Sequence, residues 1–204
     1  MAITTLTELQ TAIADRLARS DFTAAQQNEC IAFTESRMQR QLRALDMEIR
    51  EANLALTGEY VAVPADYLQV RDFYVNGATR TPLKYTSSDA LTLHYSDGAT
   101  GTPQFFTVLG GYFRFGPPPD GANTATLIYY AKFPPLTSTT TTNWILQQHP
   151  DAYLYGALME AAIRTQNPTG AAGYGQLFSE ALKSIQSSAD RGRWTGPAMA
   201  TRPG

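Results

Sequence analysis

Apolar residues recur at helical spacing near both ends of this chain and alternate with polar residues in its middle. Leu6, Leu9 and Ile13 lie three and four residues apart, which is the spacing of one helix face. Four segments share this period, and helices are predicted over residues 6–19, 23–48, 150–165 and 172–189. The two ends of the chain therefore predict one body of packed helices.

Between the predicted helices the period shortens to the alternation of β-strands. The dipeptide Asn76-Gly77 follows a run of β-branched and aromatic residues and favours a tight hairpin turn, so Leu83–Tyr85 is expected to return antiparallel. A second hairpin is predicted over 105–115, around Gly110-Gly111. A last strand is predicted over 125–133. This middle part predicts an antiparallel β module.

The predicted fold class is α+β, a helical bundle formed by the N- and C-terminal helices with an inserted antiparallel β module. The chain divides into an N-terminal helical hairpin over 1–51, the β module with a long loop over 52–142, C-terminal helices that complete the bundle over 143–189, and an extended tail over 190–204. The tail holds too few apolar residues to fold alone.

The segment from Ala152 to Met159 carries no charge, and its large apolar side chains point to every side of a helix. A helix that is apolar all round is buried all round. The run is shorter than the ~18 apolar residues that cross a bilayer. Two interpretations stay open, a core helix within one chain and a helix covered partly by a second copy of the chain.

The amino-acid composition indicates that the protein surface carries few charged residues. Charged residues make up 17% of the chain, below the ~25% of an average soluble domain, which favours coverage by partners. The formal net charge of −2 excludes a strong positive field for nucleic acid or anionic lipid. Cys30 is the only cysteine, which excludes an intrachain disulfide, and no signal peptide pattern precedes the first helix. We therefore expect a cytosolic product.

Candidate catalytic chemistry is sparse. The two histidines, His94 and His149, lie at predicted helix ends, and no metal-ligand or phosphate-loop spacing occurs. We expect neither an enzyme nor a cofactor or metal. A small hydrolase built on the β module stays as the least favoured alternative, because carboxylates that meet in space need not be adjacent in sequence.

Arg37, Arg40 and Arg43 follow one side of the second predicted helix, with carboxylates interspersed. Three interpretations are open: a solvated face with local ion pairs, pairing with carboxylates of a neighbouring subunit, or a DNA-binding or regulatory module that uses this helix. The mixed charge argues against a helix devoted to DNA.

Several segments together resemble one family, the bacteriophage head–tail adaptor (connector) proteins. The segments are Leu6–Ala14, Glu35–Arg43, Tyr60–Leu68, Gly110–Pro117, Ile128–Pro134 and Asn143–Ala162. None is a chemical motif, so the resemblance rests on their order and joint presence over most of residues 1–190.

The resemblance implies a structural protein of the virion, assembled in the host cytoplasm. It implies a homo-oligomeric ring, usually dodecameric, that joins the portal protein to a tail or nozzle protein and extends the DNA channel. The packaged DNA is expected to pass without sequence-specific contact, and no membrane is involved. The β module is expected to stand away from the helices and to contact the tail or a neighbouring subunit, since its strand edges and its aromatic residues need covering.

Two sets of residues are predicted to make these contacts. The subunit interface is predicted to contain Arg37, Arg40, Arg43, Tyr153, Tyr155, Gly156 and Met159. Docking on the portal is predicted for the tail residues Arg191, Arg193 and Trp194, an aromatic anchor flanked by guanidinium groups.

Overall fold

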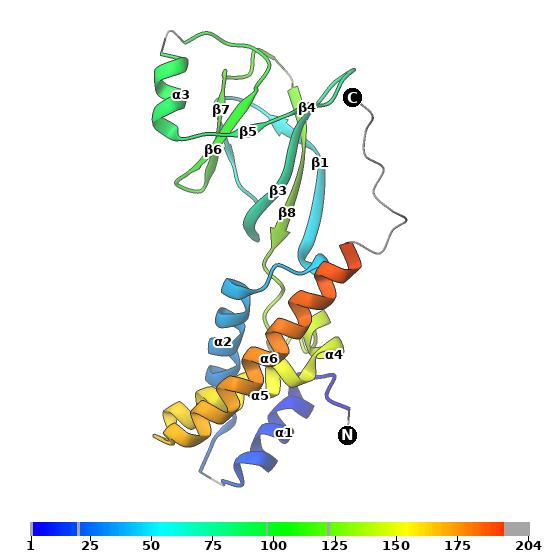
Figure 1. Ribbon diagram of the computed structural model, residues 1–204, viewed down its shortest axis with the longest axis vertical. Coiled ribbons are helices and arrows are strands. Elements are labelled where there is room, and N and C mark those ends of the chain that lie inside the picture. The colour runs from blue at the N-terminus through cyan, green and yellow to red at the C-terminus, as the bar shows by residue number, and fades with distance from the viewer. Residues whose placement is uncertain (1, 20, 97, 122, 194–204) are drawn as a thin grey trace. The chain divides into compact units, whose positions relative to one another are not determined.

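The computed structural model describes residues 2–19, 21–96, 98–121 and 123–193. Over this part of the chain the fold is α+β, and the chain separates into two compact units (Figure 1). The helical unit comprises Met1–Asp46 and Phe133–Gly204, and the β unit comprises Met47–Lys132.

The described part of the helical unit contains α1 (Leu6–Leu17), α2 (Ala24–Gln41), α4 (Trp144–Gln148), α5 (Pro150–Arg164) and α6 (Pro168–Arg193). α5 contacts each of the other four helices and so forms the centre of the unit. From Ala152 to Ala162 its residues are buried, apart from the half-buried Tyr155. The apolar pattern therefore predicted the burial of this helix correctly.

The second helix is shorter than its apolar pattern predicts. α2 ends at Gln41, where Leu42 takes an extended backbone, and β1 begins at Glu48 after a short 3₁₀ turn over Leu45–Met47. Leu42 and Met47 are still buried. The prediction of a helix to residue 48 was wrong because buried side chains continue at helical spacing after the backbone has left the helix.

The last helix begins earlier than predicted. α6 starts at Pro168 rather than near residue 172. A proline fits the first helical turn, where its missing N–H has no partner to lose. Asn167 completes the start, since its side-chain oxygen accepts the Gly170 N–H at 2.9 Å, as an N-cap residue does. Asn167 therefore caps a helix that begins at Pro168.

The β unit consists of two sheets that share one core. The first has the order β1 (Glu48–Leu56), β8 (Asn123–Ala131), β3 (Tyr67–Asn76), β4 (Thr81–Pro82). The second has the order β2 (Tyr60–Ala62), β7 (Tyr112–Gly116), β6 (Phe105–Leu109), β5 (Lys84–Tyr85). A short helix, α3 (Ser88–His94), packs on β6 and β7.

The chain returns after Asn76-Gly77, but with a shorter strand than predicted. β4 pairs antiparallel with β3, whereas β5 pairs parallel with β6 in the other sheet. The prediction that Leu83–Tyr85 returns antiparallel to the preceding strand was therefore wrong, and the second sheet is mixed. The chain changes sheets at Leu83, whose side chain is buried in the shared core.

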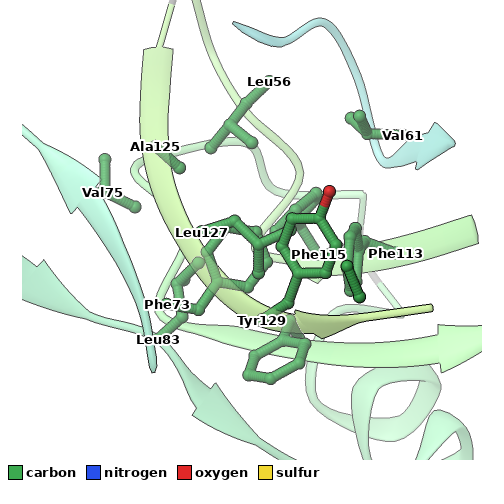
Figure 2. Close-up of a cluster of buried hydrophobic side chains, with 12 residues drawn as sticks. Leu56, Val61, Phe73, Val75, Leu83, Phe113, Phe115, Ala125, Leu127 and Tyr129 are labelled. Carbon is green, nitrogen blue, oxygen red and sulfur yellow. The ribbon is translucent and has the colours of Figure 1, made fainter. Parts of the chain in front are cut away.

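Aromatic side chains fill the space between the two sheets (Figure 2). Phe73 of β3 packs edge-to-face on three phenylalanines of the second sheet, with ring centroids 5.2 Å from Phe106, 5.2 Å from Phe113 and 5.7 Å from Phe115. The prediction that these three residues need cover from outside the module was wrong. They are instead the core of the β unit, while Tyr112 remains 49% exposed.

Candidate functional site

A chain of buried polar groups joins α2, α5 and the start of α4. The Tyr153 hydroxyl donates to Glu35 Oε1 at 2.9 Å and accepts from Asn143 Nδ2 at 2.6 Å. Glu35 Oε1 also accepts the Leu136 N–H at 2.8 Å, and Asn143 Oδ1 accepts the Leu146 N–H at 3.0 Å as the cap of α4. Two helices and the loop before α4 are thus held by one network.

Burial changes the proton affinity of this network. Burial raises the pKa of the Glu35 carboxyl, although hydrogen bonds from Leu136 and Tyr153 partly oppose the rise. Burial and the Glu35 charge also raise the pKa of the Tyr153 hydroxyl, so this tyrosine stays a neutral donor at neutral pH. The network therefore keeps the proton on the Tyr153 hydroxyl and joins α2, α5 and the loop before α4.

Two ion pairs connect α2 with α5. Arg37 Nε pairs with Glu160 Oε1, and Arg164 Nη1 pairs with Glu29 Oε2 at 2.6 Å. The Glu160 side chain is only 9% exposed, so Arg37 neutralises an almost buried carboxylate. Arg37, predicted for the subunit interface, thus has a partner inside its own chain.

The other two arginines of the predicted stripe differ from each other. Arg43 Nη1 donates to the Gln39 and Leu42 carbonyl oxygens at 3.1 and 2.5 Å, and so satisfies carbonyls at the C-terminal end of α2. Arg40 is exposed and forms no ion pair with the described residues. Of the three, Arg40 is the guanidinium left to solvent.

The predicted interface residues on α5 lie mostly inside the helical unit. Tyr153 is fully buried and Met159 is 9% exposed. At Gly156 a Cβ would lie 3.0 Å from the Phe178 ring of α6 and still closer to the Thr34 side chain of α2, so side chains of both neighbouring helices pack directly on this position. α5 is therefore covered by its own chain, and contact of these residues with a second copy stays a prediction.

Tyr155 is the exception on α5. It is half-buried, and the guanidinium carbon of Arg16 on α1 lies 5.9 Å from its ring centroid. Tyr155 and Arg16 thus mark a surface where α1 and α5 meet.

The residues predicted to dock on the portal lie at the end of the described chain. α6 continues beyond residue 189, so Asp190–Arg193 are helical and not part of an extended tail. Its last turn lies beside Leu45, whose Cδ1 would be 2.8 Å from a Cβ at Gly192. Arg191 is exposed there. Trp194 lies outside the described residues.

The remaining candidate chemical groups are scattered. Among the residues that the structure describes, no three of His, Cys, Asp and Glu gather as metal ligands. Burial raises the pKa of the Cys30 thiol to about 11, which keeps it protonated at neutral pH. His149 is half-buried with its ring 6.4 Å from the Trp144 ring, and His94 is exposed. The polar contacts of the described site join structural elements of the same chain.

Sequence reasoning missed Glu35, Asn143 and Glu160. Glu35 falls between Ile31 and Met38 on the buried stripe of α2, so a carboxylate on an apolar face was a usable signal. Asn143 stands immediately before an apolar helical run, which is the position of a cap. Their partners could not be found from sequence, because Tyr153 lies 118 residues from Glu35.

A family model described as SU10 adaptor protein matches residues 4–201. The match includes both units and nearly the whole chain. The chain belongs to the SU10 adaptor protein family. The search of curated proteins found no match.

Family membership identifies a structural adaptor of a bacteriophage, as the sequence resemblance predicts. An adaptor of this family is a component of the virion and contacts other proteins of the phage head or tail. Across the described helices, none is both long and apolar enough to cross a membrane.

Proposed function

We propose that this chain forms a closed ring of identical subunits between the portal and the tail, where it extends the DNA channel. The observation that carries the proposal is the match of the adaptor family to residues 4–201. A connector between two assemblies on one axis must repeat the same contact around that axis. Repeated head-to-tail contacts give a ring when the rotation closes, and we propose a dodecamer.

The charge of the chain supports passage of DNA through such a ring. A net charge of −2 per subunit gives no overall attraction for the phosphate backbone. DNA can then slide past without being held and without sequence-specific contact.

The helical unit and the β unit are proposed to have separate roles. The helices from both ends of the chain form the bundle that supports the ring, and the β unit contacts the tail or a neighbouring subunit. Exposed apolar side chains on the second sheet support the second role, since Tyr60 of β2, Leu109 of β6 and Tyr112 of β7 are each about half exposed.

Docking on the portal is proposed for the C-terminal end, with Arg191, Arg193 and Trp194 as contacts. A truncation after Arg193 tests the part played by Trp194 and the residues beyond it. We expect the shortened protein to fold with an unchanged circular dichroism spectrum and to attach poorly to portal-bearing heads. Heads that accept it as well as the full chain would contradict portal docking by this segment.

Electron cryomicroscopy of virions tests the ring directly. Symmetry-free reconstruction of the head–tail junction should show this chain in multiple copies around the DNA. Deletion of its gene should leave heads filled or partly filled with DNA but without attached tails. A single copy per virion, or tails that attach without the chain, would overturn the proposal.

A DNA-binding regulator that uses the arginine stripe is the weaker alternative. Arg37 is neutralised by Glu160, and Arg43 is bound to the carbonyls of its own helix. Only Arg40 of the three remains for a phosphate. Binding of duplex DNA by the purified protein at nanomolar concentration in physiological salt would favour this alternative.

A further inference from the structure

Two exposed surfaces of the helical unit each combine apolar and charged side chains. The first, here called the Phe33 ridge, consists of Phe33, Arg37 and Arg40 of α2 with Ile163 of α5. The second, here called the α1 groove, is a concavity of about 230 Å³ whose lining includes Ile3, Glu8, Ala12, Asp15 and Leu154.

The Phe33 ridge has an apolar centre with charged borders. Phe33 is 52% exposed and Ile163 is 50% exposed. Two ion pairs, Glu29–Arg164 and Arg37–Glu160, connect α2 with α5. Along each helix, these charged residues come before and after the exposed apolar residue. Arg37 and Arg40 follow Phe33 by four and seven residues, which places all three along one face of the helix. An aromatic centre bordered by arginine is the composition of an interface hot spot.

The α1 groove also combines apolar and charged side chains. Ile3, Ala12 and Leu154 give it apolar walls, and Glu8 and Asp15 give it two carboxylates. Arg16 also lines it, with its guanidinium carbon 5.9 Å from the Tyr155 ring centroid. Glu8 is occupied by the cap of α1, where its carboxylate accepts the Thr4 and Thr5 N–H groups. Asp15 is exposed and forms no ion pair with the described residues. It is a carboxylate available to Arg40 of another molecule.

The two surfaces face in opposite directions around the central helix. Leu154 borders the α1 groove and Ile163 belongs to the Phe33 ridge. At about 100° per residue these two positions of α5 lie about 180° apart around the helix axis. One copy can therefore present its ridge to one neighbour and its groove to the other, as a head-to-tail contact requires.

We propose that the Phe33 ridge of one subunit docks in the α1 groove of the next copy, with Phe33 in the concavity and Arg40 paired with Asp15. This inference rests on the proposed ring and identifies one of its contacts. A second copy is the favoured occupant because Arg40 of the ridge and Asp15 of the groove have opposite charges and neither forms an ion pair with the residues that the structure describes. The contact also explains an exposed phenylalanine on an otherwise polar helix face.

Cross-linking in assembled virions tests the contact. Phe33→Cys and Ala12→Cys are introduced together in a Cys30→Ala background, and the virions are treated with a short bismaleimide. We expect a ladder of dimers and larger multimers on a denaturing gel. Phe33→Cys paired with Gly173→Cys, an open position on α6, is the matched control and should give no ladder.

Charge reversal gives an independent measurement. Arg40→Asp and Asp15→Arg should each lower incorporation into virions about fivefold, the scale of one exposed ion pair. The double variant should restore incorporation, whereas Lys183→Asp on α6 should change it little. Thermal melting of each purified variant checks that the chain still folds.

The outcomes separate the contact from the ring itself. A ring seen in virions without a Phe33–Ala12 cross-link, or a double variant no better than its single variants, overturns the ridge-in-groove contact and leaves the proposed function standing. Cross-linked dimers from Phe33→Cys alone would also overturn it, because they require two ridges to meet. Virions without any ring of this chain overturn both proposals.

Discussion

Glu35 shows how one buried residue holds separate segments together. Its Oε1 atom accepts hydrogen bonds from the Leu136 N–H and the Tyr153 hydroxyl. Glu35→Ala removes this acceptor from the buried Tyr153 hydroxyl and the part-buried Leu136 N–H. We expect the free energy of unfolding to fall by about 1–3 kcal/mol. Urea unfolding followed by circular dichroism measures the loss, and an unchanged midpoint would contradict the network.

The same residue predicts a pH dependence. Because burial raises the pKa of Glu35 above its ordinary 4.5, the folded state favours the neutral carboxyl. The stability that this group contributes is complete below 4.5 and is lost as the pH rises through the raised pKa.

Glu35→Gln keeps the accepting oxygen but cannot ionise. We expect the stability of the wild-type protein, relative to Glu35→Gln, to decrease between about pH 4 and about pH 8. Denaturant unfolding of both proteins at the two pH values tests this. A relative stability that increased with pH would show that the site favours the carboxylate.

At the scale of secondary structure, close approach of helices decides what α5 tolerates. Gly156 has no room for a side chain between Thr34 and Phe178, whereas Gly173 on α6 faces open space. Gly156→Leu should destabilise the folded protein by about 1–3 kcal/mol or more, because the core must shift to admit it.

Gly173→Leu is the matched control for Gly156→Leu and should leave the melting temperature nearly unchanged or raise it, since leucine favours helix. Thermal melts of the isolated subunit measure both. Normal melting of Gly156→Leu would show that α5 is loosely packed. Gly156 is therefore expected to affect the stability of the single subunit, whether or not it also affects assembly.

The β6–β7 turn needs glycine at position 111 because of the backbone conformation there, and not because a side chain would lack room. Gly111 has φ +86°, and no atom beyond its two chain neighbours lies within 4 Å of the position that a Cβ would take. Gly121 is equally open without a positive φ. Gly111→Ala should cost about 1–2 kcal/mol in unfolding free energy, while Gly121→Ala should cost little. Equal effects at both positions, measured by denaturant unfolding, would contradict a left-handed backbone at Gly111.

For the whole molecule, the register of the β unit explains how one chain forms two units. Glu48 near its start pairs with Tyr130 near its end, so the chain enters and leaves through adjacent antiparallel strands. The ends of such an insertion are about one strand spacing apart. Each unit can therefore close its own core.

Replacing residues 47–132 by a short glycine linker should leave the helical unit folded. We expect the shortened protein to show a helical circular dichroism spectrum and a cooperative thermal transition, because the Glu35 network and the core of α5 lie outside the deleted segment. A molten spectrum without a cooperative transition would show that the helices need the β unit.

Much of the local structure could be predicted from the sequence. Helical spacing identified α1, α5 and α6, and the charge-free run of α5 identified its burial. Alternation and Gly110-Gly111 identified the hairpin of β6 and β7. These predictions succeed because each depends on neighbours within a few residues, where backbone preference and side-chain period are already fixed. The order of several such segments also indicated the adaptor family.

Other features were decided by tertiary structure. The end of α2, the parallel pairing of β5 and the burial of Phe106, Phe113 and Phe115 depend on residues distant in the chain, as do the partners of Arg37 and Glu35. The spacing of apolar residues along the sequence shows that a side chain is buried, but it does not show which residues cover it. The sequence by itself therefore determined the positions of the main helices, the β6–β7 hairpin and the family, while packing decided which of the predicted interface residues face the protein's own core.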